Sequence, residues 1–283
     1  MKPIVQLRSI ITNVSTVEKE IANYIISNPD RVTKMSIHEL AKESYSSTSS
    51  IVRLCKNLGY SGFKEFKHAL LAELMAFGDT ESHLETPIMA TDSISEIIEK
   101  TTQNNIQSLN DTRHLIDNNA LETIADRIHD SHNIYVFGLG SSLCICNDMY
   151  IKMTRLGKPC FYTTEYHSQM IQALNCTDAD FCLFVSFSGE TSELLELAKI
   201  AKENKAYCAA ITHYGESSLS KLCNITLYSS SNESLFSCGT MSSRISQLNL
   251  VDILFNIYCS KNYAEATMNL TKTHIKKSYS EKY

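Results

Sequence analysis

Ser186–Phe187–Ser188–Gly189–Glu190–Thr191 is the stretch of sequence that decides the fold of this chain. The apolar run 181–185 precedes it, and apolar side chains at helical spacing follow it over 194–198. We therefore expect a buried strand to end here, a turn rich in hydroxyl groups to follow, and a helix to begin. A helix start offers unpaired backbone N–H groups and the positive end of the helix dipole, which together suit a phosphate. An ordinary serine-capped helix after a strand is the alternative.

A second turn of the same kind follows the apolar run 133–137. It reads Gly138–Leu139–Gly140–Ser141–Ser142, and a helical pattern continues from there to about residue 155. A dinucleotide site would need a third glycine where Leu143 stands and an acidic residue at the end of the next strand, and the sequence has neither. Two short turns with hydroxyl groups fit a small phosphorylated ligand better, held between the carboxyl ends of neighbouring parallel strands.

The remainder of the chain alternates between apolar strand candidates and helical stretches. The strands are expected at 134–137, 160–163, 181–185, 206–212 and 225–228. Helices are expected at about 93–113, 117–130 and 240–260, and in the intervals between strands. This pattern predicts an α/β three-layer sandwich with a parallel five-stranded sheet, buried on both faces.

The first 76 residues are expected to be all helical. Ser15–Glu18 and Ser36–Glu39 are capping boxes that open two helices. After a short polar turn, Ser47 caps a third helix whose apolar side chains repeat at helical spacing from Ile51 to Leu58. Two short helices joined by a tight turn are typical of a helix-turn-helix that reads DNA. Tyr45 stands in the turn where many such proteins have glycine.

The outward face of that third helix carries small polar and basic side chains, which can reach phosphates and base edges. The candidate DNA-binding residues are Ser47, Thr48, Ser49, Ser50, Arg53 and Lys56, with Lys64 extending the basic surface. Residues 1–77 carry a net charge of +3 and the rest of the chain −8, so the head alone is expected to meet a polyanion. A helical interaction domain with a solvated polar face is the alternative.

The ten cysteines are scattered through apolar stretches. The closest pair, Cys144 and Cys146, has no second pair at zinc spacing, so we expect no metal and no cofactor. Buried free thiols in a reducing cytoplasm are the better interpretation. We find no signal peptide and no apolar run near the roughly 20 residues of a membrane span, so we expect a soluble cytoplasmic protein with no membrane partner.

The run Ser47–Lys64, which reads STSSIVRLCKNLGYSGFK, resembles the helix-turn-helix signature of the RpiR family of bacterial transcription regulators. Its arginine and its Leu-Gly and Gly-Phe pairs are the specific parts. That family joins such a head to a sugar isomerase (SIS) domain, whose phosphosugar turns resemble 138–142 and 186–191 here, in the same order. The resemblance extends from about residue 3 to about residue 260.

The resemblance implies that the body binds a sugar phosphate. The ligand-binding residues expected on this basis are Gly140, Ser141, Ser142, Ser186, Phe187, Ser188, Gly189 and Thr191. His167, in a His-x-Gln segment with Gln169, and Glu233, in an acidic loop, are expected to border the sugar. Packing or surface roles are equally open for these last two sites.

The expected organisation is a DNA-binding head over 1–76, a linker over 77–92 and an SIS domain over 93–283. The expected function is a transcription regulator that binds double-stranded operator DNA under the control of a phosphorylated sugar. We favour a repressor of sugar or amino-sugar catabolism genes that acts as a homodimer or homotetramer. We do not expect an enzyme. The alternative is a sugar-phosphate isomerase with an accessory head, for which His167, Glu190 and Glu233 would be the acid and base candidates.

Overall fold

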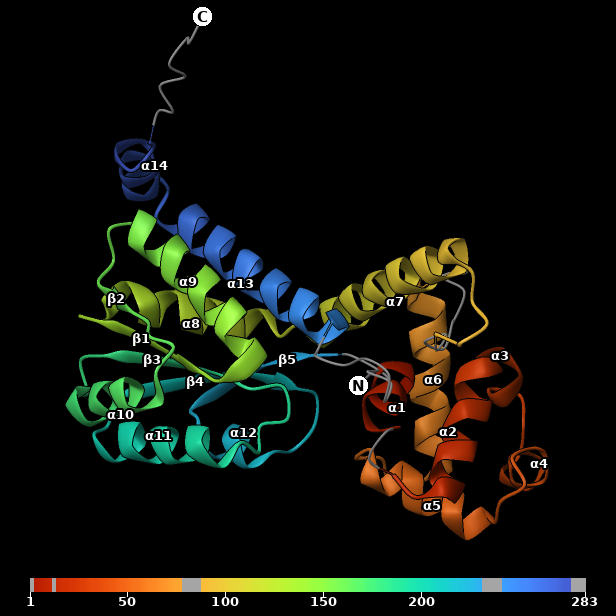
Figure 1. Ribbon diagram of the computed structural model, residues 1–283. Coiled ribbons are helices and arrows are strands. Elements are labelled where there is room, and N and C mark those ends of the chain that lie inside the picture. The colour runs from red at the N-terminus through yellow and green to blue at the C-terminus, as the bar shows by residue number, and fades with distance from the viewer. Residues whose placement is uncertain (1–2, 12–13, 78–87, 231–240, 276–283) are drawn as a thin grey trace, which may run out of the picture. The chain divides into compact units, whose positions relative to one another are not determined.

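The computed structural model describes residues 3–11, 14–77, 88–230 and 241–275 (Figure 1). The chain forms two compact units, which are described separately below. The first consists of Met1–Ile116, His213–Gly215 and Tyr228–Ser246, and the second of Asp117–Thr212, Glu216–Leu227 and Gln247–Tyr283. The boundaries of the functional domains therefore stay a prediction from the sequence.

The head of the first unit is built from short helices. They are α1 (Pro3–Ile10), α2 (Thr16–Ser27), α3 (Pro29–Val32), α4 (Ile37–Glu43), α5 (Thr48–Asn57) and α6 (Phe63–Phe77). Both predicted capping boxes are present, with Ser15 and Ser36 accepting from the backbone N–H groups of Glu18 and Glu39. These helices enclose one apolar core that includes Ile21, Ile25, Leu40, Ile51, Leu54 and Phe66. Each such side chain stabilises the head by about 1.5–3 kcal/mol when it leaves water.

A buried cluster of charged side chains joins α1 to α6 and to the next helix, α7 (Ile94–Leu115). Arg8 forms an ion pair with Asp111 of α7, with 3.0 Å between Arg8 Nη1 and Asp111 Oδ1, and both side chains are at most 5 % exposed. Glu73 of α6 accepts a 2.8 Å hydrogen bond from the backbone N–H of Ile4, at the start of α1. Burial raises the pKa of Glu73 to about 7.

The sheet has five strands, as the sequence predicted, and their order is β2-β1-β3-β4-β5. Their bounds are Ile134–Gly138 for β1, Cys160–Phe161 for β2, Phe181–Val185 for β3, Tyr207–His213 for β4 and Ile225–Ser229 for β5. The pairs β1–β2, β1–β3 and β3–β4 are parallel. Every residue of β1 and β3 is buried, which agrees with their uninterrupted apolar sequences.

Helices cover both faces of this sheet (Figure 1). On one face lie α10 (Tyr166–Asn175), α11 (Ser192–Glu203) and α12 (Ser218–Leu222), whose apolar side chains share a core with Phe137 and Phe184. The opposite face carries α8 (Asn118–Asp130), α9 (Leu143–Arg155) and α13 (Met241–Lys261). The predicted three-layer sandwich is therefore confirmed. The chain continues into a further helix, α14 (Tyr263–Lys272).

The direction of the strand order reverses at β1. After β1 the chain adds β2 on one side, and it then returns to add β3 on the other side. The register pairs Ile134 with Phe181 and Gly138 with Val185, so β1 and β3 end at the same edge of the sheet. Ligands of open parallel sheets bind outside the carboxyl ends of the strands at such a reversal.

Candidate functional sites

The two hydroxyl-rich turns leave neighbouring strands at that reversal. The turn 138–142 begins at Gly138, the last residue of β1, and the turn 186–191 begins directly after Val185, which is the register partner of Gly138. Adjacent strands lie about 4.8 Å apart, so a single small ligand can reach both turns. The structure thus brings together the candidate residues on these turns, and their contact with a ligand stays a prediction.

Hydrogen bonds within the chain shape the turn after β3. Ser186 Oγ accepts from the backbone N–H of Gly189 at 3.1 Å, and Thr212 Oγ1 donates to the carbonyl oxygen of Phe187 at the same distance. Gly189 has φ +66°, and an added Cβ would lie 2.4 Å from Ser217 Oγ. Both the backbone conformation and the lack of space therefore require glycine at this position.

The helices that follow the two turns begin without a side-chain cap. α9 has Ser142 at its N-cap and α11 has Thr191, and neither side chain bonds to the first turn of its helix. By contrast, α8, α10 and α12 in the same unit are capped by Asp117, Glu165 and Ser217. However, α9 continues directly from the 3-10 helix η1 (Gly140–Ser142), and the N–H of Leu143 already donates to the carbonyl oxygens of Gly140 and Ser141. The start of α11, which has no side-chain cap and carries the positive end of the helix dipole, is therefore the better of the two for an anion.

Gln169 holds the end of β1 in place. Its side chain is fully buried, its Oε1 accepts from the backbone N–H of Gly138 at 3.2 Å, and its Nε2 donates to the carbonyl oxygens of Gly138 and Thr163 at 2.9 and 3.1 Å. From the sequence, the segment with Gln169 was expected either to border the sugar or to have a packing role. Its contacts are instead with the backbone of the strand end that leads into the first turn, so it positions that turn.

The remaining candidates beside the sugar have different surroundings. His167 is exposed in the first turn of α10, where its backbone N–H bonds to Glu165 Oε1. Glu190 accepts a 2.7 Å hydrogen bond from the backbone N–H of Ser218, and bonding to Ser218 is the main reason that its pKa is lowered. Glu233 lies outside the described residues.

The predicted DNA-reading face is present on α5. Ser47 caps the helix by accepting from the N–H of Ser50 at 3.1 Å, and its hydroxyl also bonds to those of Ser49 and Ser50. Arg53 and Lys56 are exposed on the same helix. The candidates Ser47, Thr48, Ser49, Ser50, Arg53 and Lys56 therefore occupy one accessible helix and its cap.

The guanidinium of Arg53 has a partner that the sequence did not reveal. Its Nε donates to Glu18 Oε1 at 3.0 Å, and Asn57 Nδ2 approaches the same oxygen at 3.4 Å. The Arg53 side chain is 60 % exposed whereas that of Glu18 is 8 % exposed. Glu18 therefore orients the inner edge of the guanidinium and leaves the rest of it accessible.

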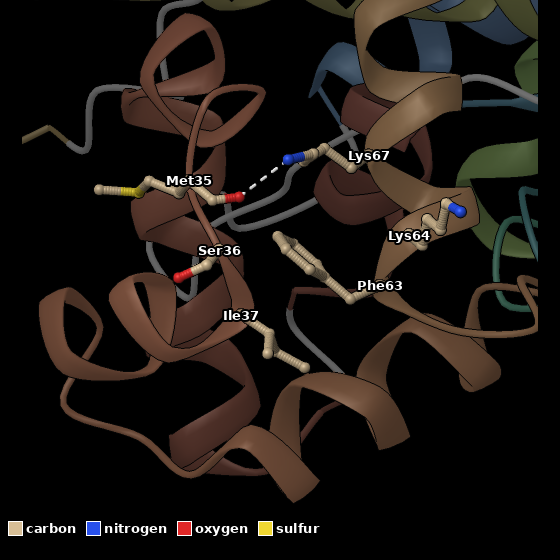
Figure 2. Close-up of a pocket in the computed structure, with 6 residues that line it drawn as sticks. All are labelled: Met35, Ser36, Ile37, Phe63, Lys64 and Lys67. Atoms are coloured by element: carbon tan, nitrogen blue, oxygen red, sulfur yellow. Dashed lines mark hydrogen bonds between the residues drawn. The ribbon is translucent and has the colours of Figure 1, made fainter.

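A hollow of about 370 Å³ lies between the start of α4 and the start of α6 (Figure 2). Its lining is Met35, Ser36, Ile37, Phe63, Lys64 and Lys67. Lys67 Nζ donates to the carbonyl oxygen of Met35 at 3.0 Å, as the dashed line in Figure 2 shows. Lys64 is exposed at the edge of this hollow. It belongs to α6, whereas the other candidate DNA-binding residues lie on α5 and at its N-cap.

Within the described residues, no three or more His, Cys, Asp or Glu side chains are grouped so that they could hold a metal ion. The nine cysteines among these residues form no disulfide. Cys144 is exposed, whereas the sequence predicted buried thiols. None of the described helices combines the length and the apolar character that crossing a membrane requires.

Comparison with known proteins assigns both parts of the chain. Residues 1–76 match the model of the helix-turn-helix domain of the rpiR family, and residues 127–257 match the model of the SIS domain. An uncharacterized HTH-type transcriptional regulator of Caldanaerobacter subterraneus is 32 % identical over 94 % of each chain. The HTH-type transcriptional regulator HexR of Escherichia coli is 28 % identical over 96 % of this chain and 93 % of its own.

Solved structures agree with this assignment. The NanR protein of Vibrio vulnificus, complexed with ManNAc-6P, superposes with a TM-score of 0.59 and 28 % identity over 96 % of both chains. The sugar isomerase domain of an RpiR transcription factor from Sphaerobacter thermophilus has a TM-score of 0.58 at 18 % identity, covering 62 % of this chain and 97 % of its own, and this shows a shared fold. The hydroxyl-rich turns, the helix-turn-helix head and these matches together establish that the chain belongs to the RpiR family of transcriptional regulators with an SIS domain.

Proposed function

We propose that a phosphorylated sugar binds at the carboxyl ends of β1 and β3 and controls DNA binding by the head. The observation that carries this proposal is the pair of hydroxyl-rich turns that follow adjacent strands at the reversal of the strand order, the second of which leads into the uncapped start of α11. A phosphate there would accept from the hydroxyls of the turns and from backbone N–H groups at the start of α11. NanR of Vibrio vulnificus was solved with ManNAc-6P, which makes N-acylated hexosamine 6-phosphates the first ligands to test.

The phosphate contacts in this proposal come from two turns. The first supplies Gly140, Ser141 and Ser142, and the second supplies Ser186, Phe187, Ser188, Gly189 and Thr191. His167 is exposed and able to meet the sugar end of the ligand, while Gln169 acts only by positioning the first turn. In the head, Ser47 to Ser50, Arg53 and Lys56 contact the DNA, and Lys64 adds a contact to its backbone.

The proposed control is a difference in affinity between two arrangements of a dimer. Operators with half-site symmetry are read by symmetric pairs of heads, so a homodimer or homotetramer suits a single-headed chain. The sugar phosphate must bind the DNA-competent and the DNA-incompetent arrangements unequally, because equal binding shifts nothing. We favour repression that the sugar phosphate relieves, with genes of sugar or amino-sugar catabolism as the targets.

A thermal-shift screen with a panel of sugar phosphates tests the ligand proposal, because a ligand that prefers the folded chain raises its melting temperature. Calorimetry on the best ligand would then compare Ser188→Ala with Ser131→Ala. Ser188 lies in the second turn, whereas Ser131 precedes β1 at the opposite edge of the sheet. We expect Ser188→Ala to weaken binding and Ser131→Ala to leave it unchanged. Equal affinity in both variants would remove the proposed pocket.

The isomerase alternative is weaker because of the position of Glu190. A general acid or base must reach the proton that it transfers, and the Glu190 carboxylate is already bonded to the start of α12. The relatives named above are also transcriptional regulators. Incubation of the protein with aldose and ketose phosphates, followed by product analysis, decides between the two. Turnover that Glu190→Gln abolishes would establish the enzyme.

A further inference from the structure

The connection between α4 and α5 places a tyrosine where the backbone requires a left-handed conformation. The N–H of Ser46 donates to the carbonyl oxygen of Ala41 at 2.8 Å, and the N–H of Tyr45 donates to that of Lys42 at 3.3 Å. These two bonds define a Schellman motif, whose penultimate residue is left-handed and is usually glycine. Here that residue is Tyr45, with φ +48°.

The same motif ends three other helices, which gives an internal comparison. Gly59 after α5 and Gly157 after α9 occupy the left-handed position with φ of +87° and +74°. Lys205 after α11 is the second case without glycine, with φ +65°. A side chain at such a position costs about 1–2 kcal/mol relative to the right-handed conformation. The fold itself therefore favours glycine at both Tyr45 and Lys205.

Packing does not compensate for this cost at Tyr45. Its side chain is 97 % exposed, more than any other large apolar or aromatic side chain exposed in the described part of the chain. A buried tyrosine would gain apolar contacts, and this one gains almost none. Backbone strain of this kind is concentrated at functional sites. Lys205 is also exposed, so the inference for Tyr45 depends in addition on its place beside α5.

The place of Tyr45 indicates which partner. Two residues later, Ser47 caps α5 at the end from which a recognition helix enters the major groove. The DNA backbone lies beside that end, and a tyrosine hydroxyl is one of the groups that donate to phosphate oxygens in protein–DNA complexes. Tyr45 also precedes the cluster of hydroxyls formed by Ser47, Ser49 and Ser50.

We propose that the hydroxyl of Tyr45 donates to a backbone phosphate of bound DNA and so fixes the depth and register of α5 in the groove. This inference rests on the proposed DNA-binding role of α5. Tyr45 is then a positioning residue for DNA whose contribution does not depend on base sequence. A contact between two copies of the chain is the other use of an exposed tyrosine, and the experiment below separates it.

The test uses the full-length protein and two duplexes. One is enriched from a random library by the wild-type protein, and the other has a mixed sequence that was not selected. Fluorescence anisotropy gives the affinity for each, thermal melting gives stability, and light scattering gives the oligomeric state. Tyr45→Phe removes only the hydroxyl and keeps the left-handed backbone. Tyr45→Gly also removes the strain, and Lys205→Gly is the matched control far along the sequence in the other compact unit.

We expect Tyr45→Phe to melt as the wild type does and to bind both duplexes about ten- to a hundredfold more weakly, the effect of one lost hydrogen bond to a charged group. We expect Tyr45→Gly to melt higher and bind at least as weakly. Lys205→Gly should melt higher and keep the wild-type affinity. Wild-type affinity in Tyr45→Phe, or a change in oligomeric state with unchanged DNA binding, would overturn the proposal. If the wild-type protein binds neither duplex, the DNA-binding function itself fails.

Discussion

The Nε of Arg53 donates to Glu18 Oε1 across 3.0 Å and joins the exposed face of α5 to the first turn of α2. The same carboxylate accepts from the hydroxyl of Ser15, at 2.7 Å, in the capping box of α2. One buried acid thus caps one helix and orients a basic side chain on another. This contact therefore fixes the exposed face of α5 to α2 within the chain itself.

Replacement of Arg53 is predicted to separate DNA binding from ligand binding. Arg53→Ala should weaken binding to a selected operator by about 1–3 kcal/mol if the guanidinium reads a base, while the affinity for the sugar phosphate stays the same. Arg31→Ala removes an equal charge from the head at a residue that pairs with Glu43 on another helix. Gel-shift assays on both variants check this prediction. An equal loss of DNA affinity in the two variants would mean that Arg53 contributes only its positive charge and does not read a base.

The buried Glu73 predicts an unusual dependence of stability on pH. Burial raises its pKa from 4.5 to about 7, so the folded state holds this proton more tightly than the unfolded state does. Its contribution is therefore fully present below pH 4.5 and is lost as the pH rises towards 7. In Glu73→Gln this part of the dependence should disappear. The free energy of unfolding, measured with denaturant from about pH 4 to about pH 8, tests this, because that range covers both pKa values.

Glu65 on the same helix supplies the matched control. It is exposed, and hydrogen bonds from Ser61 lower its pKa below 4.5. Its contribution is present above pH 4.5 and is lost only as the pH falls below that value. Glu65→Gln should therefore leave the interval from 4.5 to 7 unchanged. A loss of slope in that interval for Glu65→Gln would contradict the assignment to Glu73.

Gly189→Ala is predicted to destabilise the second turn through two separate effects. The left-handed backbone alone costs about 1–2 kcal/mol, and the new Cβ would also lie 2.6 Å from Ser217 Cβ and 2.9 Å from Thr212 Oγ1. Gly140→Ala separates the two, because Gly140 has φ +56° but no atom within 4 Å of the position that a Cβ would take. Thermal melting should show the larger loss at Gly189. Similar losses would mean that Ser217 moves aside at little cost.

Gln169→Ala should destabilise the SIS domain and weaken ligand binding together. The substitution leaves the buried N–H of Gly138 and the carbonyl of Thr163 without their partner, at a cost of about 1–3 kcal/mol per group. Gln172→Ala on the same helix is the control, because the buried Oε1 of Gln172 has no hydrogen-bond partner. Melting and calorimetry of both variants test this. Normal ligand affinity in Gln169→Ala would show that the first turn does not need its anchor.

The sequence was sufficient for features that depend on local chemistry. The strands β1 and β3 were predictable because strands buried on both faces are continuous apolar runs. The starts of α2 and α4 were predictable because a capping box joins residues only three positions apart. The two hydroxyl-rich turns were visible in the sequence for the same reason, since their glycines and hydroxyls are close together in the chain, whereas their contact with a phosphate stays a prediction.

Contacts between distant residues could not be predicted in this way. Glu18 and Arg53 are 35 positions apart. No local sequence pattern in either segment predicts that their side chains are in contact. From the sequence, Glu190 was an acid or base candidate. In the structure its carboxylate accepts a hydrogen bond from the backbone N–H of Ser218, 28 positions later. The helical character of residues 1–76 was predicted, but the bounds of α1 were not, because it has no capping box and its contacts with Glu73 and Asp111 depend on the fold.

The turn after β3 is fastened to α12 at two successive residues. The N–H of Leu219 donates to the carbonyl oxygen of Gly189 at 3.0 Å, and that of Ser218 donates to the Glu190 carboxylate. A displacement of this turn must either break both bonds or carry the short helix along with it. A ligand that displaces the turn would therefore also displace α12, without contacting that helix.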